Sequence, residues 1–82
     1  MIEVLYFAWL RERAGTPRER VETAAPTVAA LVEELRARSE GHALAFSDLR
    51  AVRVAVDQKL ASFEAPLEGT REVAFFPPMT GG

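Results

Sequence analysis

The segment whose residue types could do chemistry is the end of the chain, which reads Pro77-Pro78-Met79-Thr80-Gly81-Gly82. Glycine has no Cβ, so an extended diglycine end fits a channel too narrow for other side chains. Pro77 and Pro78 predict a stiff, extended root for this tail, because proline restricts the backbone and donates no N–H to a sheet. The reactive group at such an end is the main-chain carboxylate of Gly82. We therefore predict a tail that inserts Gly82 into the active site of another protein.

The rest of the chain offers no set of residues with the spacing of an active site. There is no cysteine, which excludes disulfides, thiolate metal sites and a catalytic thiol. The single histidine, His42, has no metal-ligating residues at suitable spacing, and we interpret it as a structural residue in a loop or partly buried. No serine has a recognisable catalytic base, because the sequence does not place His42 beside any of them. The glycines are dispersed and form no phosphate-binding loop. We predict no metal site and no catalytic machinery of its own.

The composition indicates one small globular domain. The chain has 82 residues, of which 49% are hydrophobic and 27% charged, with a net charge of −2. Its basic residues are scattered, which argues against nucleic-acid binding. No apolar run approaches the roughly 18 residues that a membrane span needs, and no signal peptide precedes the first strand pattern, so we expect a cytoplasmic protein. We divide the chain into a folded domain, residues 1–76, and a tail, residues 77–82.

The chain opens with a strand pattern over residues 2–7. Alternation predicts that Ile2, Val4 and Tyr6 face the core and that Phe7 faces the opposite side. A short helical turn is expected over residues 8–14.

The clearest helix signal follows Thr27, a residue suited to an N-cap. Apolar residues recur there at helical spacing, at Val28, Leu31, Val32 and Leu35. We expect Gly41 to stop this helix, and residues 41–50 to form a loop with a helical turn around residues 43–46.

Further strands are predicted over residues 18–23, 52–56, 60–61 and 72–76, with a turn at 57–59. The first and last strands are the most apolar, so they should be central, parallel neighbours. One helix can cover only one face of such a sheet. The expected fold is α+β: a ubiquitin-like β-grasp roll, in which one main helix packs on one face of a four- or five-stranded mixed sheet.

The chain resembles the small, sulfur-carrying subunits of molybdopterin synthase over essentially its whole length. The matching segments are residues 4–8, 10–12, 14–15, 54–58 and 72–82. The ending Phe-Pro-Pro-x-x-Gly-Gly is the most specific, because the related thiamine-pathway carriers usually lack the double proline. Asp57 stands where that family often has Asn.

This resemblance implies a chemical role for Gly82. An adenylating, E1-like enzyme would consume ATP and attach AMP to the Gly82 carboxylate, and sulfur from a persulfide donor would then leave a thiocarboxylate there. The large synthase subunit would bind the cyclic pyranopterin monophosphate precursor, in a heterotetramer with two carriers. No cofactor would be bound stably.

Partner recognition should involve the sheet face opposite the helix and the root of the tail. From the positions that resembling carriers use, we expect the interface to include Phe7, Arg11, Leu60 and Phe75.

Three alternatives remain open from the sequence. The chain could be a thiamine- or tRNA-type sulfur carrier, or a ubiquitin-like modifier joined through Gly82 to lysines of other proteins. It could also be a β-grasp binding module whose tail has no function.

Overall fold

The computed structural model describes residues 1–78. Its elements follow in the order β1 (Ile2–Tyr6), α1 (Trp9–Ala14), β2 (Arg18–Val21), α2 (Val28–Arg36), α3 (Glu40–Ala45), the 3₁₀ helix η1 (Leu49–Ala51), β3 (Arg53–Val56), β4 (Lys59–Ala61) and β5 (Glu72–Phe76). The expected strands are therefore present, and most begin or end within a residue or two of their predicted limits.

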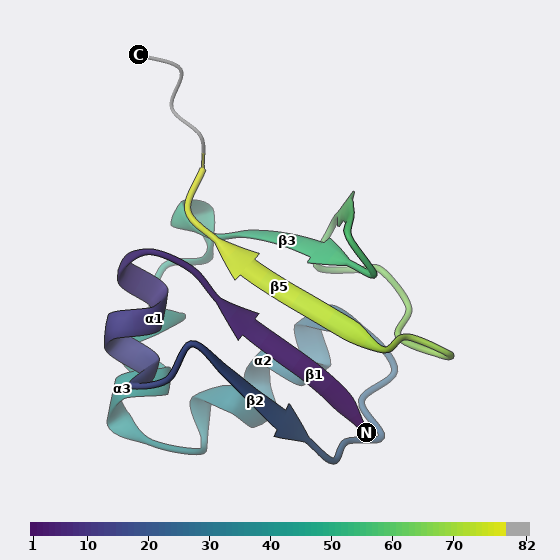
Figure 1. The fold of residues 1–82 in the computed structure, drawn as a ribbon, viewed down its shortest axis with the longest axis horizontal. Helices are drawn as coiled ribbons and strands as arrows, with labels where there is room; N and C mark the ends of the chain where they lie inside the picture. Colours follow the sequence, from purple (N-terminus) through teal and green to yellow (C-terminus); the bar gives the residue numbers. More distant parts are fainter. Residues whose placement is uncertain (79–82) are drawn as a thin grey trace.

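The strands form one mixed sheet with the order β2-β1-β5-β3-β4 (Figure 1). β1 and β5 are parallel, with Val4 opposite Val73 and Tyr6 opposite Phe75. The other neighbouring pairs are antiparallel. The prediction that the first and last strands are parallel neighbours in the sheet is confirmed, and it places the root of the tail at the end of a central strand.

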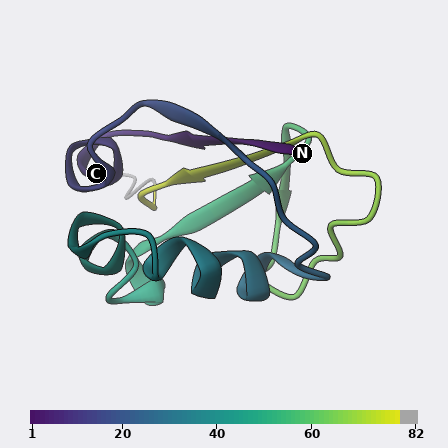
Figure 2. The same cartoon turned by 90° about the horizontal axis from the view of Figure 1, so that it is seen from below.

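The helices α2 and α3 lie against one face of the sheet, as the view from below shows (Figure 2). α2 begins where the sequence predicts, because the Thr27 hydroxyl accepts a hydrogen bond from the Ala30 N–H at 3.2 Å. Its apolar stripe is fully buried, and it consists of Val28, Leu31, Val32 and Leu35. The prediction of one main helix on one face of the sheet is confirmed. The described residues form two shorter α-helices besides it, α1 and α3.

The core between the sheet and the helices contains a cluster of three aromatic rings. Tyr6 and Phe75 stack at a centroid distance of 6.3 Å, and Phe46 meets Phe75 edge-on at 4.9 Å. These rings join β1 and β5 to the segment after α3. Large apolar rings dominate the stability of a core this small.

The segment between α2 and β3 differs from the prediction. α2 ends at Arg36, and Gly41 lies inside α3 rather than stopping a helix. Ser39 begins α3, because its hydroxyl accepts a hydrogen bond from the His42 N–H at 3.1 Å. A Cβ on Gly41 would collide with the carbonyl oxygen of Arg13, so glycine is needed there for the close approach of α1 and α3.

Candidate functional site

The root of the tail lies where β5 leaves the sheet. β5 ends at Phe76, and the chain continues beyond the sheet through Pro77 and Pro78 (Figure 1). The four residues predicted to form the rest of the inserting tail, Met79, Thr80, Gly81 and Gly82, lie outside the described residues. The structure therefore describes the root of the tail, residues 77–78, and the proposed reactive end at Gly82 stays a prediction.

The sheet face that α2 and α3 leave open carries a row of apolar side chains. The strand registers place Leu5 opposite Ala74, Ala74 opposite Ala55, and Ala55 opposite Leu60. Residues directly opposite one another in a sheet share a face, so these four side chains cross β1, β5, β3 and β4 in a line. Leu60, at the edge, is 76% exposed.

A groove of about 540 Å³ lies beside this row, at the root of the tail. Its apolar walls are formed by Phe7, Ala74, Phe76, Pro77 and Pro78. Gln58 and Glu72 complete its lining. An exposed apolar surface rimmed by polar groups is typical of a protein-docking site.

Three of the four predicted interface residues are exposed. Phe7 is 47% exposed and lines the groove, while Leu60 ends the apolar row. Arg11 is exposed on α1. Among these, Phe7 and Leu60 share the open sheet face, whereas Arg11 lies on the helix that follows β1.

The prediction that Phe75 belongs to the interface is wrong. Phe75 is 0% exposed and lies in the aromatic cluster of the core. The register of β5 places it opposite Tyr6 and Val54, both of which face the helices. Because successive strand residues point to opposite faces, its neighbour Phe76 lies on the open face instead.

The sequence contained a signal that could have identified Phe76. Glu72 is charged and therefore belongs on the exposed side of β5, and the two-residue period then places Ala74 and Phe76 on that same side. The Phe75-Phe76 doublet conceals this signal, because either phenylalanine could fill an apolar core position.

A turn between β3 and β4 positions the start of β5. Asp57 and Gln58 form it with positive φ angles of 49° and 70°. The Asp57 carboxylate accepts hydrogen bonds from the N–H groups of Arg71 at 3.0 Å and Glu72 at 2.9 Å. The predicted turn is confirmed, and Asp57 also connects it to the strand that leads to the tail.

On the helix side of the sheet, a polar cluster surrounds the Glu19 carboxylate. One oxygen of Glu19 accepts from the Tyr6 hydroxyl at 2.6 Å and from His42 Nε2 at 2.7 Å. Its other oxygen pairs with Arg38 at 3.3 Å. The Ser39 hydroxyl lies 2.7 Å from His42 Nδ1, so both ring nitrogens have partners. His42 is buried in α3 rather than in a loop, so of its two expected settings the structure gives the buried one, in agreement with a structural role.

This cluster shifts two pKa values in opposite directions. Burial raises the pKa of Tyr6 above its usual range, and its hydrogen bond to the Glu19 carboxylate adds to the effect. Burial alone would also raise the pKa of Glu19. The hydrogen bonds from Tyr6 and His42, together with the positive charge of Arg38, outweigh burial and lower it. Glu19 therefore stays ionised as the anchor of the edge strand β2.

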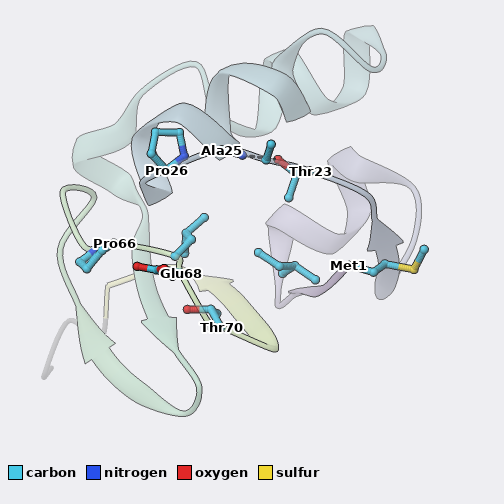
Figure 3. A pocket seen from close by; sticks show the side chains of 11 residues that line it. Met1, Thr23, Ala25, Pro26, Pro66, Glu68 and Thr70 are labelled. Carbon is cyan, nitrogen blue, oxygen red and sulfur yellow. Dashed lines mark hydrogen bonds between the residues drawn. The ribbon is translucent and has the colours of Figure 1, made fainter.

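A second hollow, of about 690 Å³, lies at the other end of the molecule (Figure 3). It is lined by the N-terminal residues Met1 and Ile2, by the segment after β2 and by the segment before β5. Since β1 and β5 are parallel, Ile2 lies at the opposite end of the sheet from Phe76. This hollow is therefore separate from the tail root.

Two further features bear on the kind of site present. Within residues 1–78, no three His, Asp or Glu side chains lie together in a way that could hold a metal ion. No helix in that range is long and apolar enough to cross a membrane.

The mixed five-stranded sheet, with parallel central strands and helices on one face, defines a ubiquitin-like β-grasp protein. The chain belongs to the ThiS family, whose model matches residues 4–82. It is 49% identical over 82 residues to the molybdopterin synthase sulfur carrier subunit of Escherichia coli, and the match covers 100% of both chains.

Other known proteins show the same likeness. The molybdopterin synthase sulfur carrier subunit of Haemophilus influenzae is 37% identical, again over 100% of both chains. Among solved structures, SAMP1 from Haloferax volcanii superimposes with a TM-score of 0.72 at 25% sequence identity, covering 99% of this chain and 98% of that one.

Proposed function

We propose that this protein is the sulfur carrier of molybdopterin synthase and that it has no catalytic machinery of its own. The observation that carries the proposal is the 49% identity to the Escherichia coli sulfur carrier subunit over the whole of both chains. The apolar groove at the root of the tail supports it, because a carrier must dock on a partner while its end reaches the partner's active site.

The proposed chemistry begins at the Gly82 carboxylate. A carboxylate oxygen attacks the α-phosphorus of ATP in an adenylating partner, so that an acyl–AMP anhydride forms and pyrophosphate leaves. The terminal sulfur of a protein persulfide then attacks the acyl carbon and AMP leaves. A thiol reduces the resulting S–S bond, which releases a thiocarboxylate on Gly82 and a disulfide on the donor.

The thiocarboxylate sulfur is a good nucleophile that needs no base from this chain. In the proposed synthase, the large subunit binds the cyclic pyranopterin monophosphate precursor and supplies the acid and base groups. One dithiolene needs two sulfur atoms, so two carriers serve each product, as in a heterotetramer. ATP is consumed by the adenylating partner and no cofactor is bound stably; the reaction takes place in the cytoplasm.

The open face explains how one small protein could serve two partners in turn. Phe7 and Phe76 line the groove together with Pro77 and Pro78, and Leu60 is exposed on the same face of the sheet. Each partner would cover the same face and receive the same tail. Docking would therefore be exclusive, and the carrier would have to leave the adenylating enzyme before it bound the large subunit.

Intact-mass measurement tests the chemistry. Incubation of the full chain with ATP, the adenylating enzyme and a persulfide donor should raise its mass by the sulfur-for-oxygen difference, on the C-terminal peptide alone. A variant lacking Gly82, and one extended by a residue beyond it, should show no change. An unchanged mass of the natural chain, beside a control carrier that is converted, would contradict the proposal.

The diglycine end, together with the ubiquitin-like β-grasp fold, keeps protein modification as a second candidate. In that case the same activated Gly82 would be joined to lysines of other proteins. Denaturing gels of cell extracts would then show conjugates that disappear when Gly82 is deleted, whereas a dedicated carrier yields the thiocarboxylate and no such ladder.

A further inference from the structure

The groove at the tail root contains one charged side chain. Of the seven residues that line it, five are apolar, Gln58 is neutral, and Glu72 carries a carboxylate. Glu72 begins β5 and is half-buried. Any partner that fills the groove therefore meets this carboxylate beside an apolar surface.

The surroundings of Glu72 within its own chain are unfavourable. The register of β1 and β5 places it directly opposite Glu3, so two like charges share a face. Arg18 pairs with Glu3 at 3.1 Å. Within residues 1–78, no Lys, Arg or His nitrogen lies within 4.0 Å of the Glu72 carboxylate.

Like charges directly opposite each other destabilise a strand pair. Such departures from favourable local pairing concentrate at functional sites, where stability is given up for binding. Glu72 is therefore better explained by a contact made in a complex than by the stability of the free protein.

A positive group lies on the opposite side of the apolar row from Glu72, toward the end of β5. Arg53, at the start of β3, is opposite Phe76 in the register, so it lies on the open face beside the tail root. Its guanidinium donates to the carbonyl oxygens of Arg50 and Val52. No carboxylate within residues 1–78 forms an ion pair with it. The row from Leu5 to Leu60 thus lies between a carboxylate and a guanidinium.

We infer that Glu72 receives a Lys or Arg side chain of the large synthase subunit, and that Glu72 and Arg53 together set the direction in which that subunit docks. The inference rests on the proposed function, which supplies the partner. A carboxylate covered by an apolar surface needs a cationic partner, because a buried, unpaired charge is costly. If the large subunit docked in the reversed orientation, its cationic side chain would lie beside Arg53 at the tail root, and the two positive charges would repel each other.

Binding of the full-length chain to the purified large subunit tests this inference. We expect Glu72→Lys to weaken binding by about tenfold or more, and Glu72→Gln by less, because the lysine repels the incoming cation. Arg53→Gln should also weaken binding. These effects should shrink between ionic strengths of about 0.05 M and about 0.15 M, as charge interactions are screened.

Glu3→Gln is the matched control. It removes the same charge from the same cross-strand pair but not from the groove, so binding should change by about twofold or less. Thermal unfolding of the free protein provides a second readout. Glu72→Gln should unfold at the same or a higher temperature than the natural chain, because the repulsion from Glu3 is gone.

The possible results separate the inference from the proposed function. If both Glu72 variants bind the large subunit more weakly but are at least as stable to heat as the natural chain, the inference is supported. Binding of Glu72→Lys and Arg53→Gln as tight as that of the natural chain would overturn it and leave the sulfur-carrier function in place. Failure of the natural chain itself to bind the large subunit would instead contradict the proposed function.

Discussion

Phe75 and Phe76 are neighbours of the same residue type on one strand, yet they belong to different parts of the molecule. Phe75 points toward the helices and is completely buried among Tyr6 and Phe46. Phe76 points to the open face and lines the groove at the tail root. The comparison shows that one face of the sheet holds the domain together, while the other remains available to a partner.

The largest effect should follow from Phe75→Ala. Removing a buried phenylalanine leaves a cavity and typically costs about 3–5 kcal/mol in the free energy of unfolding. A small domain has only about 5–15 kcal/mol in total, so the variant should be close to unfolding at room temperature. Urea denaturation followed by circular dichroism measures this loss. A loss below about 1 kcal/mol would contradict the placement of Phe75 in the core.

The companion change, Phe76→Ala, should separate binding from stability. Phe76 is half-buried, so its loss should change the free energy of unfolding by about 1 kcal/mol or less. If the large subunit covers the groove, removal of this aromatic anchor should weaken binding by about 30-fold, or about 2 kcal/mol. Calorimetric titration measures the affinity.

The two phenylalanine variants serve as controls for each other. If Phe76→Ala lost binding but kept its unfolding curve, this would support the assignment of stability to the helix-side face and of binding to the open face. If Phe76→Ala unfolded as readily as Phe75→Ala, the division of roles between the faces would be wrong.

Much of the fold could be predicted from the sequence because the deciding signals are local. The alternation of Ile2, Val4 and Tyr6 indicates one buried strand face, and it is confirmed. The Thr27 cap and the apolar stripe after it predict the start and the buried face of α2. Each of these signals spans a few consecutive residues.

The errors involve contacts between residues far apart in the chain. Gly41 was expected to stop a helix, but its role depends on the carbonyl of Arg13, 28 positions earlier. The bond between His42 and Glu19 likewise joins residues 23 positions apart. The spacing of apolar residues within one segment gives no information about such long-range contacts.

The site was predicted in part, and for a comparable reason. The diglycine tail follows from residue type, and alternation along residues 2–7 places Phe7 on the open face. Leu60, which is also exposed, was expected at the interface from the resemblance to the carrier subunits. The choice between Phe75 and Phe76 depends on the register of β5 against β1 and β3, which the doublet leaves ambiguous. The tip of the tail, residues 79–82, lies outside the described structure, so the role of Gly82 stays a prediction.

The smallest effect concerns the polar cluster on the helix side of the sheet. Glu19→Gln removes the charge that Tyr6, His42 and Arg38 share, and it should cost about 1–2 kcal/mol near neutral pH. The cost should depend on pH, because the pKa of Glu19 is lower in the folded protein than in the unfolded chain. The unfolded state then binds more protons as the pH falls, so stability rises with pH in that range.

The contribution of Glu19 is present above its ordinary pKa of about 4.3 and is lost as the pH falls through the lower pKa of the folded state. The gap in unfolding free energy between the natural chain and Glu19→Gln should therefore narrow from about pH 6 to about pH 3. Urea denaturation at several pH values measures that gap. Glu22→Gln, an exposed acid just after β2, should show no comparable gap. A gap that stayed constant with pH would mean that the charge of Glu19 does not stabilise the attachment of β2, and that packing alone holds this face together.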